Sequence, residues 1–257
     1  MSSPAFEDGR YLYCAVVDRE NSRFETSGIE DEQVSLISRD QVAVVVHPVQ
    51  ELYDSDDMTT VRRWLLDHQR VVDEAGDTFG TPLPFQFDTI LQGDDATVRT
   101  WLDDQYDTLE DALLSLRGCW EYRIGLEWDA SALRAEIEAN DPSVDNLVTE
   151  VESASEGTAY LLEKQLERSI SERVRQRRRD LANELTTTVD PYVEEIKTVG
   201  GNDDRSVVEV SVLASSDQEG RLGQQLETFA ERPLLDVTYT GPWPPYSFAP
   251  VIGGDDP

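Results

Sequence analysis

The sequence predicts an α+β fold, and three observations support this class. Strand-like apolar runs alternate with two helical patterns through about the first half of the chain. Residues 131–198 then read as almost continuously helical, and a strand, a helix and a last strand follow from residue 206. Strands and helices that are partly segregated along the chain, instead of alternating strictly, are typical of α+β proteins.

The first half predicts a small layer of strands with two helices packed against them. The strand-like runs cover residues 11–17, 33–38, 41–47, 81–91 and 119–128, and the helical patterns cover residues 59–76 and 93–118. Arg39-Asp40 is a hairpin turn, Pro48 is expected to end the strand before it, and Gly76 is expected to stop the first helix. The order of these elements is close to a ferredoxin-like arrangement.

The second half is dominated by helix. Two breaks are predicted, at Asp141-Pro142 and Asp190-Pro191, because a residue that precedes proline disfavours the α region. Residues 200–204 (GGNDD) predict a turn. The elements after it are a strand at 206–213, a helix at 217–231 and a strand at 234–240.

The charge balance is extreme, with 53 acidic residues against 22 basic ones and a net charge of −31. Such a surplus destabilises a compact state, because the acidic groups repel one another. In molar salt the Debye length falls to about 3 Å, so this repulsion is screened. The composition is therefore typical of a protein from a very salty cytosol; a dedicated acidic protein with a basic partner is the other interpretation. The acidic residues are spread along the whole chain, which favours salt adaptation and disfavours nucleic acid as a partner.

Membranes and secretion are also disfavoured. No run approaches the roughly 20 apolar residues of a membrane span, and the start of the chain lacks the basic and apolar regions of a secretory signal. Cys14 and Cys119 stand in apolar, strand-like runs, where buried free thiols are expected; a disulfide between them is the alternative interpretation. We expect a cytosolic protein with no membrane partner.

A search for catalytic, metal or cofactor motifs finds none. The chain has no GxSxG, Walker, GxGxxG or CxxC pattern. His47 ends a strand and His68 lies on the apolar face of a helix, where packing or capping is favoured over catalysis or metal binding. Asp54, Asp56 and Asp57 suggest a calcium loop, but the required glycine and glutamate are missing, so an acidic solvated loop is favoured. We predict no catalytic residue, no metal and no cofactor.

One basic concentration stands out in this acidic chain. Its members are Arg173, Arg175, Arg177, Arg178 and Arg179. These arginines are either a docking patch for an acidic partner or a helix face paired with its own carboxylates. Pairing is favoured, because Glu172 with Arg175 and Arg177 with Asp180 stand three residues apart on a helix. Arg178 falls on the apolar stripe and is expected to have a buried or interfacial role.

The C-terminal segment at 240–250, TGPWPPYSFAP, carries no charge and holds four prolines and three aromatic rings. It is either an exposed proline-rich segment that a partner protein binds, or a structural plug, meaning a segment that is buried and closes the fold. The plug is favoured, because the segment continues directly from a predicted strand and its prolines lose little entropy on folding. A plug predicts that Trp243, Tyr246 and Phe248 are largely buried against the second domain, and that Trp243→Ala costs roughly 3–5 kcal/mol.

The same segment closely resembles the C-terminal signature of the gas vesicle protein F/L family. The residues that carry this resemblance are Gly241, Pro242, Trp243, Pro244, Pro245, Tyr246, Ser247 and Phe248. LPFQFDTI is similar to the family's Leu-Pro-x-x-Phe-Gly-Thr pattern through Leu83, Pro84, Phe87 and Thr89, and His68 stands where the family has a histidine. Asp88 departs from the expected glycine, and Gln86 departs from the usual basic residue.

The resemblance implies a modified ferredoxin-like N-terminal domain at 1–117 and a helix-rich α+β C-terminal domain at 118–257. It implies a non-enzymatic accessory protein of gas vesicle assembly, present in the cytoplasm and on the gas vesicle. Its partners would be the major shell protein and other accessory gas vesicle proteins. A small-molecule-binding regulatory protein is the alternative, since ferredoxin-like sheets host many functions, and an enzyme that uses scattered carboxylates ranks third.

Overall fold

The computed structural model describes residues 5–18, 23–200, 205–250 and 252, so most of the turn predicted at 200–204 lies outside the described residues. The chain divides into two compact units. Unit 1 comprises residues 1–121 together with 242–257, and unit 2 comprises residues 122–241. The division near residue 121 is close to the expected boundary after 117, but the C-terminal tail groups with unit 1.

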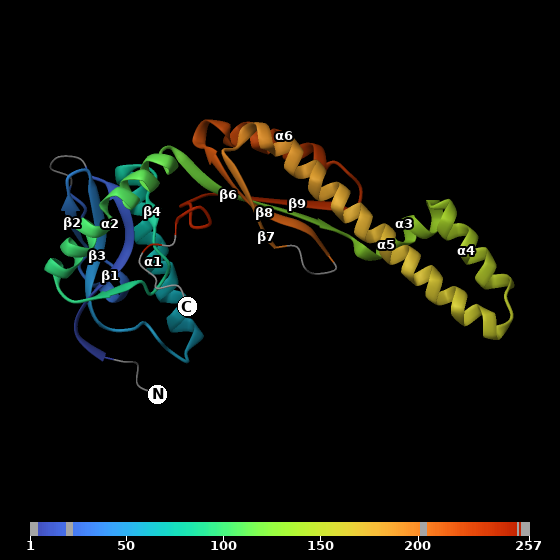
Figure 1. Ribbon diagram of the computed structural model, residues 1–257, viewed down its shortest axis with the longest axis horizontal. Helices are drawn as coiled ribbons and strands as arrows, with labels where there is room; N and C mark the ends of the chain where they lie inside the picture. The colour runs from blue at the N-terminus through green and yellow to red at the C-terminus, as the bar shows by residue number, and fades with distance from the viewer. Residues whose placement is uncertain (1–4, 19–22, 201–204, 251, 253–257) are drawn as a thin grey trace. The chain divides into compact units, whose positions relative to one another are not determined.

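Unit 1 is a mixed sheet-and-helix domain that is consistent with a modified ferredoxin-like arrangement (Figure 1). Its elements are β1 (Ala5–Val17), the short 3-10 helix η1 (Ile29–Asp31), β2 (Ser35–Arg39), β3 (Val42–Glu51), α1 (Met58–Phe79), β4 (Leu83–Pro84), β5 (Ile90–Gln92) and α2 (Asp95–Leu116). The sheet order is β2-β3-β1-β4, and β5 also pairs with β1. These pairings are antiparallel.

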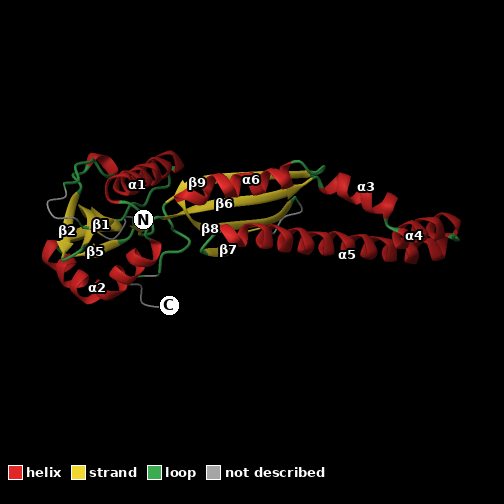
Figure 2. Cartoon of the chain, turned by 90° about the horizontal axis from the view of Figure 1, so that it is seen from above, coloured by secondary structure: helices red, strands yellow, loops and turns green. Residues whose placement is uncertain are grey.

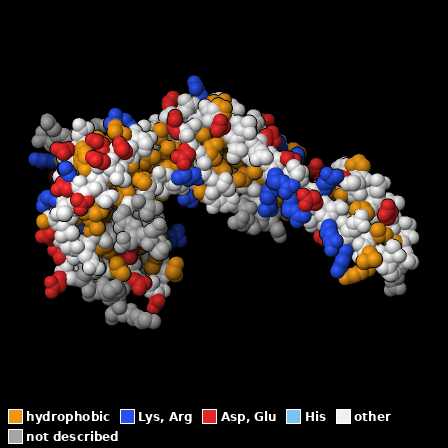
Figure 3. Space-filling model, viewed as in Figure 1, with side chains coloured by type: hydrophobic (Ala, Val, Ile, Leu, Met, Phe, Trp, Pro, Cys, Tyr) orange, Lys and Arg blue, Asp and Glu red, His pale blue; other side chains and the backbone are white. Residues whose placement is uncertain are grey.

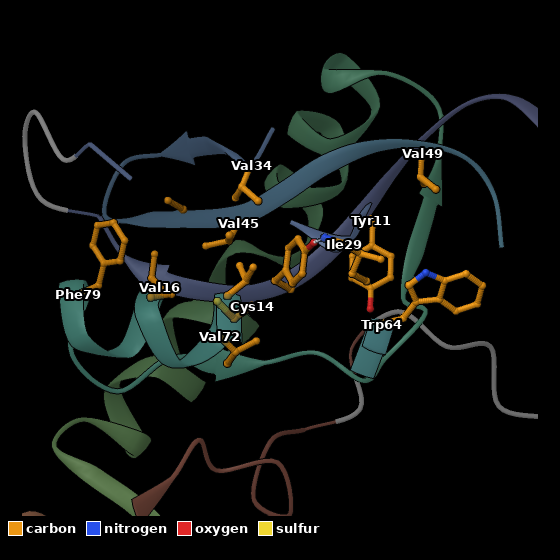
Figure 4. Packing of buried hydrophobic residues seen from close by; sticks show 14 residues of the cluster. Tyr11, Cys14, Val16, Ile29, Val34, Val45, Val49, Trp64, Val72 and Phe79 are labelled. Carbon is orange, nitrogen blue, oxygen red and sulfur yellow. Dashed lines mark hydrogen bonds between the residues drawn. The ribbon is translucent and has the colours of Figure 1, made fainter. Parts of the chain in front are cut away.

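Helices α1 and α2 cover opposite faces of this sheet, as Figure 2 shows. The expected layer of strands thus has both predicted helices packed against it, one on each face. The arrangement explains why the apolar runs at 11–17 and 42–46 are continuous: both faces of β1 and β3 are buried, so alternate positions cannot be polar. On the α1 face, the core cluster gathers Tyr11, Cys14 and Val16 against Val72 and Phe79 (Figure 4).

Two predicted ends in unit 1 shift for identifiable reasons. Strand β3 continues through Pro48, because its pairing with β2 ends at Val46 and the missing N–H of the proline breaks no bond there. Helix α1 continues past Gly76 to Phe79. A Cβ at Gly76 would lie 2.8 Å from the ring of Trp120, so this glycine permits close packing and does not end the helix.

Unit 2 is rich in helix and carries a second antiparallel sheet. Its elements are β6 (Cys119–Trp128), α3 (Ala130–Asn140), α4 (Pro142–Ser153), α5 (Glu156–Val189), η2 (Asp190–Tyr192), β7 (Glu195–Gly200), β8 (Ser206–Ser215), η3 (Ser216–Gln218), α6 (Glu219–Ala230) and β9 (Leu235–Trp243). The sheet order is β7-β8-β6-β9. Strands β6, β7, β8 and β9 with α5 and α6 follow the β-α-β-β-α-β sequence of ferredoxin-like domains, and α3 and α4 are inserted before α5.

Helices end at both predicted proline breaks of unit 2, α3 at Asn140 and α5 at Val189. The break at Asp141-Pro142 is confirmed, because Pro142 opens α4 and the Asp141 carboxylate accepts from the backbone N–H of Ser143 at 2.9 Å. The helical prediction beyond Asp190-Pro191 is wrong. Residues 195–200 form β7, which pairs with β8, so a hairpin replaces the last turns of the predicted helix.

The two cysteines are buried free thiols, as expected from their apolar surroundings. Burial raises the pKa of the Cys14 thiol, so this group is a protonated, apolar part of the core. Among the described residues, no helix combines the length and the apolar character that crossing a membrane requires. The α+β class predicted from the sequence is confirmed.

Candidate functional site

Two buried histidines organise the polar centre of unit 1. His47 and His68 come from β3 and α1 and are 0% and 3% exposed. Each ring lies between two tyrosine hydroxyls. His47 Nδ1 lies 2.7 Å from the Tyr13 hydroxyl and its Nε2 lies 2.9 Å from the Tyr53 hydroxyl. His68 Nδ1 lies 2.8 Å from Tyr11, and its Nε2 lies 3.1 Å from Tyr246. We call these six residues the tyrosine–histidine cluster.

Backbone donors set the direction of these hydrogen bonds. The Tyr11 hydroxyl accepts from the Asp88 N–H at 3.1 Å, and the Tyr13 hydroxyl accepts from the Ile29 N–H at 2.9 Å. Each of these hydroxyls then has its own proton to donate to the nearby histidine Nδ1. In the tautomer in which both hydroxyls donate, Nδ1 is the acceptor on each imidazole and Nε2–H donates to Tyr53 or Tyr246. Every polar ring atom of the two histidines has a partner.

Burial keeps the cluster uncharged at neutral pH. It lowers the pKa of His47 to about 4, with a further contribution from His68, and lowers the pKa of His68 to about 4. Burial also raises the pKa of Tyr11 and Tyr13. A general base works best with a pKa near the operating pH. Neutral, mutually satisfied rings instead provide a rigid hydrogen-bonded centre, and this agrees with the packing role favoured for His47 and His68.

The Leu83–Thr89 motif encloses this cluster from one side. Leu83 and Pro84 pair with β1, and the carbonyl of Thr89 accepts from the Leu12 N–H at 2.8 Å. The Phe87 ring centroid lies 6.1 Å from that of Tyr11 and 5.9 Å from that of His68.

Asp88 explains why the family pattern has glycine at this position. Its φ is +65°, in the left-handed region that favours glycine and that aspartate tolerates better than most residues. Its carboxylate accepts from the Tyr53 N–H at 3.2 Å.

The C-terminal tail completes the cluster. Pro244 and Pro245 are buried, Phe248 is 9% exposed, and Tyr246 reaches His68. Ser247 donates from both its N–H and its hydroxyl to the Glu121 carboxylate, each at 2.8 Å, and Glu121 is 1% exposed. The tail is thus packed within unit 1.

Two expectations for the tail therefore need correction. The tail packs within unit 1 and not against the second domain, because Tyr246 and Ser247 find their partners on α1 and at the start of β6. Trp243 is 42% exposed at the end of β9, next to Gly241 with φ +135° and the exposed Pro242. Trp243→Ala therefore cannot cost the 3–5 kcal/mol that is expected for a buried ring.

The arginine run lies on α5, where Figure 3 shows basic side chains gathered over this helix. Arg173 pairs with Asp141 at 2.8 Å, and Arg175 and Arg179 pair with Glu172 at 2.7 and 3.2 Å. Intramolecular pairing thus accounts for three of the five arginines. Asp180 accepts from Gln176 at 2.7 Å in place of the predicted bond from Arg177. The Arg178 guanidinium lies 5.5 Å from the Trp128 ring centroid, a cation–π contact that explains its place on the apolar stripe.

An acidic cleft of about 680 Å³ borders the tyrosine–histidine cluster at Tyr53. Exposed carboxylates and the aromatic side chains of Tyr53 and Trp64 line it, and the carboxylates belong to Asp8, Glu30, Glu32, Glu51 and Asp54. The indole N–H of Trp64 donates to Glu30 at 3.1 Å. The predicted acidic loop next to this cleft has a structural role, since Asp57 caps α1 by accepting from the Thr59 N–H at 3.0 Å. Within the described part of the chain, no three histidines, cysteines or carboxylates are grouped so that they could hold a metal.

Several important residues escaped the prediction from sequence. Tyr11 and Tyr13 project to the same face of β1, and their i, i+2 spacing is a signal that could have shown this. Tyr53 and Glu121 had no such local signal, because their partners are distant in the chain. The structure brings together His68, the Leu83–Thr89 motif and Tyr246 within unit 1, whereas the arginine run belongs to unit 2.

Comparisons with known proteins agree on one family. A family model described as "Gas vesicle synthesis protein GvpL/GvpF" matches residues 9–250. The chain is 42% identical over 264 residues to gas vesicle protein L2 of Halobacterium salinarum, covering 97% of this chain and 94% of that protein. It is 40% identical over 258 residues to gas vesicle protein L1 of the same organism, covering 96% and 92%. It is 35% identical over 286 residues to gas vesicle protein L of Haloferax mediterranei, covering 96% and 89%.

The fold is also similar to solved structures. The crystal structure of the gas vesicle protein GvpF from Anabaena sp. PCC7120 aligns with a TM-score of 0.81 at 19% identity, over 97% of this chain and 99% of that one. GvpF from Microcystis aeruginosa aligns with a TM-score of 0.72 at 17% identity, over 95% and 99%. Halobacterium salinarum and Haloferax mediterranei are halophilic archaea, in agreement with the acidic composition of this chain.

Proposed function

Because this chain belongs to the gas vesicle synthesis protein GvpL/GvpF family, we propose that it is a non-enzymatic accessory protein that binds the major shell protein during gas vesicle assembly. Other accessory gas vesicle proteins are further partners in this proposal, and its locations are the cytoplasm and the gas vesicle. The observation that carries the proposal is the family match, which extends over residues 9–250 and therefore includes both units.

The geometry supports binding over catalysis. The most organised polar site, the tyrosine–histidine cluster, is buried, neutral and internally satisfied, so its histidines are committed to holding β1, β3, α1 and the tail together. Its role is to keep unit 1 rigid. A rigid domain loses little conformational entropy when it binds a partner, and this favours affinity.

In this proposal the accessory protein transiently covers apolar surface of the shell subunit. Shell subunits expose apolar surfaces that would aggregate before they join the wall of the vesicle, and a bound accessory protein shields those surfaces until the subunit is added. The surplus of carboxylates that gives this chain its net charge of −31 favours the solubility of such a complex.

Two experiments test this function. Deletion of the gene in its host is expected to abolish or deform gas vesicles, and re-expression of the full chain is expected to restore them. The purified chain, tagged and immobilised in molar KCl, is expected to capture the major shell protein. Normal vesicles in the deletion strain, together with no capture of the shell protein, would overturn the proposal.

The acidic cleft favours a second candidate, a small-molecule-binding regulatory protein. Its carboxylates beside Tyr53 and Trp64 would suit a cationic ligand. Calorimetric titration with spermidine tests this candidate, with the double variant Glu30→Gln, Glu32→Gln as the control. Saturable binding that the double variant loses would support the candidate, and heats equal to those of dilution would exclude a polyamine ligand.

A further inference from the structure

Strand β3 has an open edge near its C-terminal end. Its pairing with β2 ends at Val46, whereas its pairing with β1 continues to Glu51. The backbone groups of successive residues in a strand point to alternate sides. The carbonyl of Gln41, directly before β3, accepts from the Asp18 N–H at 2.8 Å on the β1 side, so the odd-numbered positions of β3 face β1. The even-numbered positions face the other side.

Pro48 and Gln50 therefore present their backbone groups where the pairing with β2 has ended. Both side chains are exposed, and no described strand pairs with β3 on that side beyond Val46. Pro48 has no N–H to donate, whereas Gln50 offers an N–H and a carbonyl. Such backbone groups at a strand edge are a template for another extended chain.

The acidic cleft extends along this edge, since residues 48–51 form one part of its lining. Further carboxylates in the lining come from other segments of unit 1, namely Asp8, Glu30, Glu32 and Asp54. No lysine or arginine is among the described residues that line the cleft. Glu32, Glu51 and Asp54 also form no ion pair with a described residue, in contrast to Asp8 and Glu30. The charge of the cleft is therefore complementary to a cation.

Two aromatic rings indicate which cation fits. The ring centroids of Tyr53 and Trp64 lie 5.1 Å apart, and Val49 and Trp64 lie at the same end of the core (Figure 4). The Tyr53 hydroxyl is held by His47 and the Trp64 indole by Glu30. A guanidinium can bond to carboxylates and stack on an aromatic ring at the same time. The cleft is thus matched to arginine side chains.

The same charges exclude several occupants. Charged residues and proline at a strand edge commonly prevent association with other strands. Here the carboxylates repel a second copy of this chain, which also carries a net charge of −31. They repel anionic lipid surfaces and nucleic acids in the same way. A strand that carries arginine is attracted instead.

We propose that the open edge of β3 and the acidic cleft bind an extended segment of a partner protein with arginine at alternate positions. The segment adds a strand by pairing its backbone with Gln50, and its arginines enter the cleft beside Glu32 and Glu51. This binding site is additional to the shell-protein interaction proposed above. In molar salt the Debye length is about 3 Å, so only charges in direct contact interact, whereas backbone hydrogen bonds persist. Backbone pairing therefore supplies affinity, and the cleft selects the side chains.

The test is the binding of a fluorescent, acetylated and amidated peptide, Thr-Arg-Val-Arg-Thr, to the full-length chain in 3 M KCl, measured by anisotropy. Gln50→Pro removes the edge N–H, and the matched control Gln50→Ala keeps it. Proline is tolerated at an edge position that faces away from the neighbouring strand, as Pro48 shows, and the urea midpoint checks the fold. We expect a dissociation constant below about 1 mM, raised at least about tenfold by Gln50→Pro and less than about twofold by Gln50→Ala.

Two further comparisons do not depend on Gln50→Pro. The same peptide with N-methylated backbone amides is expected to lose binding to the wild-type chain, because it keeps the side chains but cannot pair as a strand. The double variant Glu32→Gln, Glu51→Gln is expected to weaken the arginine peptide and to leave an all-threonine peptide unaffected. An equal effect on both peptides would refute the selection by charge.

The outcomes separate this inference from the functions proposed above. No saturable binding of the arginine peptide, or equal binding of its N-methylated form, would overturn it. If spermidine displaces the peptide and Gln50→Pro binds both as the wild type does, the cleft takes free cations; the inference then fails and the small-molecule candidate stands. Capture of the shell protein is measured separately, so its presence or absence leaves this result unchanged.

Discussion

The two buried histidines make the stability of unit 1 depend on pH. The pKa of each imidazole is lowered from 6.5 to about 4, mainly by burial. Between these two pH values the unfolded chain binds more protons than the folded chain, so the free energy of unfolding falls as the pH falls. The stabilising contribution is complete above pH 6.5 and is lost progressively towards pH 4.

The magnitude follows from the shift. At pH 5 an unfolded histidine is almost fully protonated and a folded one is mostly neutral, which costs about 2 kcal/mol per histidine and about 4 kcal/mol for both. His47 and His68 are almost inaccessible to solvent, so screening by water does not reduce this value substantially. For comparison, the whole stability of a domain is typically about 5–15 kcal/mol.

Urea unfolding in 3 M KCl at pH 7, 6 and 5 measures the effect. Carboxylates also titrate at the lower end of this range, so the comparison is between wild type and His68→Gln, which keeps a polar side chain without a titrating ring. The variant is expected to lose about 2 kcal/mol less than wild type between pH 7 and pH 5. An equal loss in the two proteins would refute the reasoning.

A direct measurement is independent of how the variant folds. The chain has two histidines, so two imidazole resonances can be followed by NMR during a pH titration of the native protein. Both are expected to stay neutral down to about pH 5. A midpoint near 6.5 for either resonance would show that its ring is not held in a dry environment.

Three further predictions concern stability. Ser247→Ala removes the hydrogen bond from the serine hydroxyl to the buried Glu121 carboxylate. It is expected to lower the free energy of unfolding by about 1.5–3 kcal/mol, measured by urea unfolding at pH 7. A change below about 0.5 kcal/mol would contradict a tightly docked tail. Gly76→Ala is expected to lower the thermal midpoint, because its Cβ would meet the Trp120 ring at 2.8 Å. The control Gly223→Ala lies in α6 with open space around it and is expected to stabilise the protein by about 0.5–1 kcal/mol. Stabilisation by both substitutions would show that Trp120 moves aside without cost. Lowering KCl from several molar to about 0.1 M is expected to reduce the urea midpoint, and an unchanged midpoint would refute the screening argument.

Much of the local structure was readable in the sequence because its causes are local. Asp141-Pro142 starts a helix, since proline has no N–H to lose at that position and the aspartate caps the first turn. Gly76 shows the limit of such signals. A glycine in a helical pattern is compatible with both a helix end and a close contact, and the choice depended on Trp120, which is 44 positions further along the chain.

The sequence by itself determined the α+β class, most element positions, the salt-adapted charge and the family, the last through a tail whose residues are distinctive when read in order. Tertiary structure decided which face each helix covers, which unit holds the tail, and how each histidine is paired. Tyr246 and His68 are separated by 178 positions, so no local pattern could indicate their hydrogen bond. The physical reason is that backbone preferences act between neighbours in the chain, whereas burial and the pairing of polar groups depend on residues that only folding brings together.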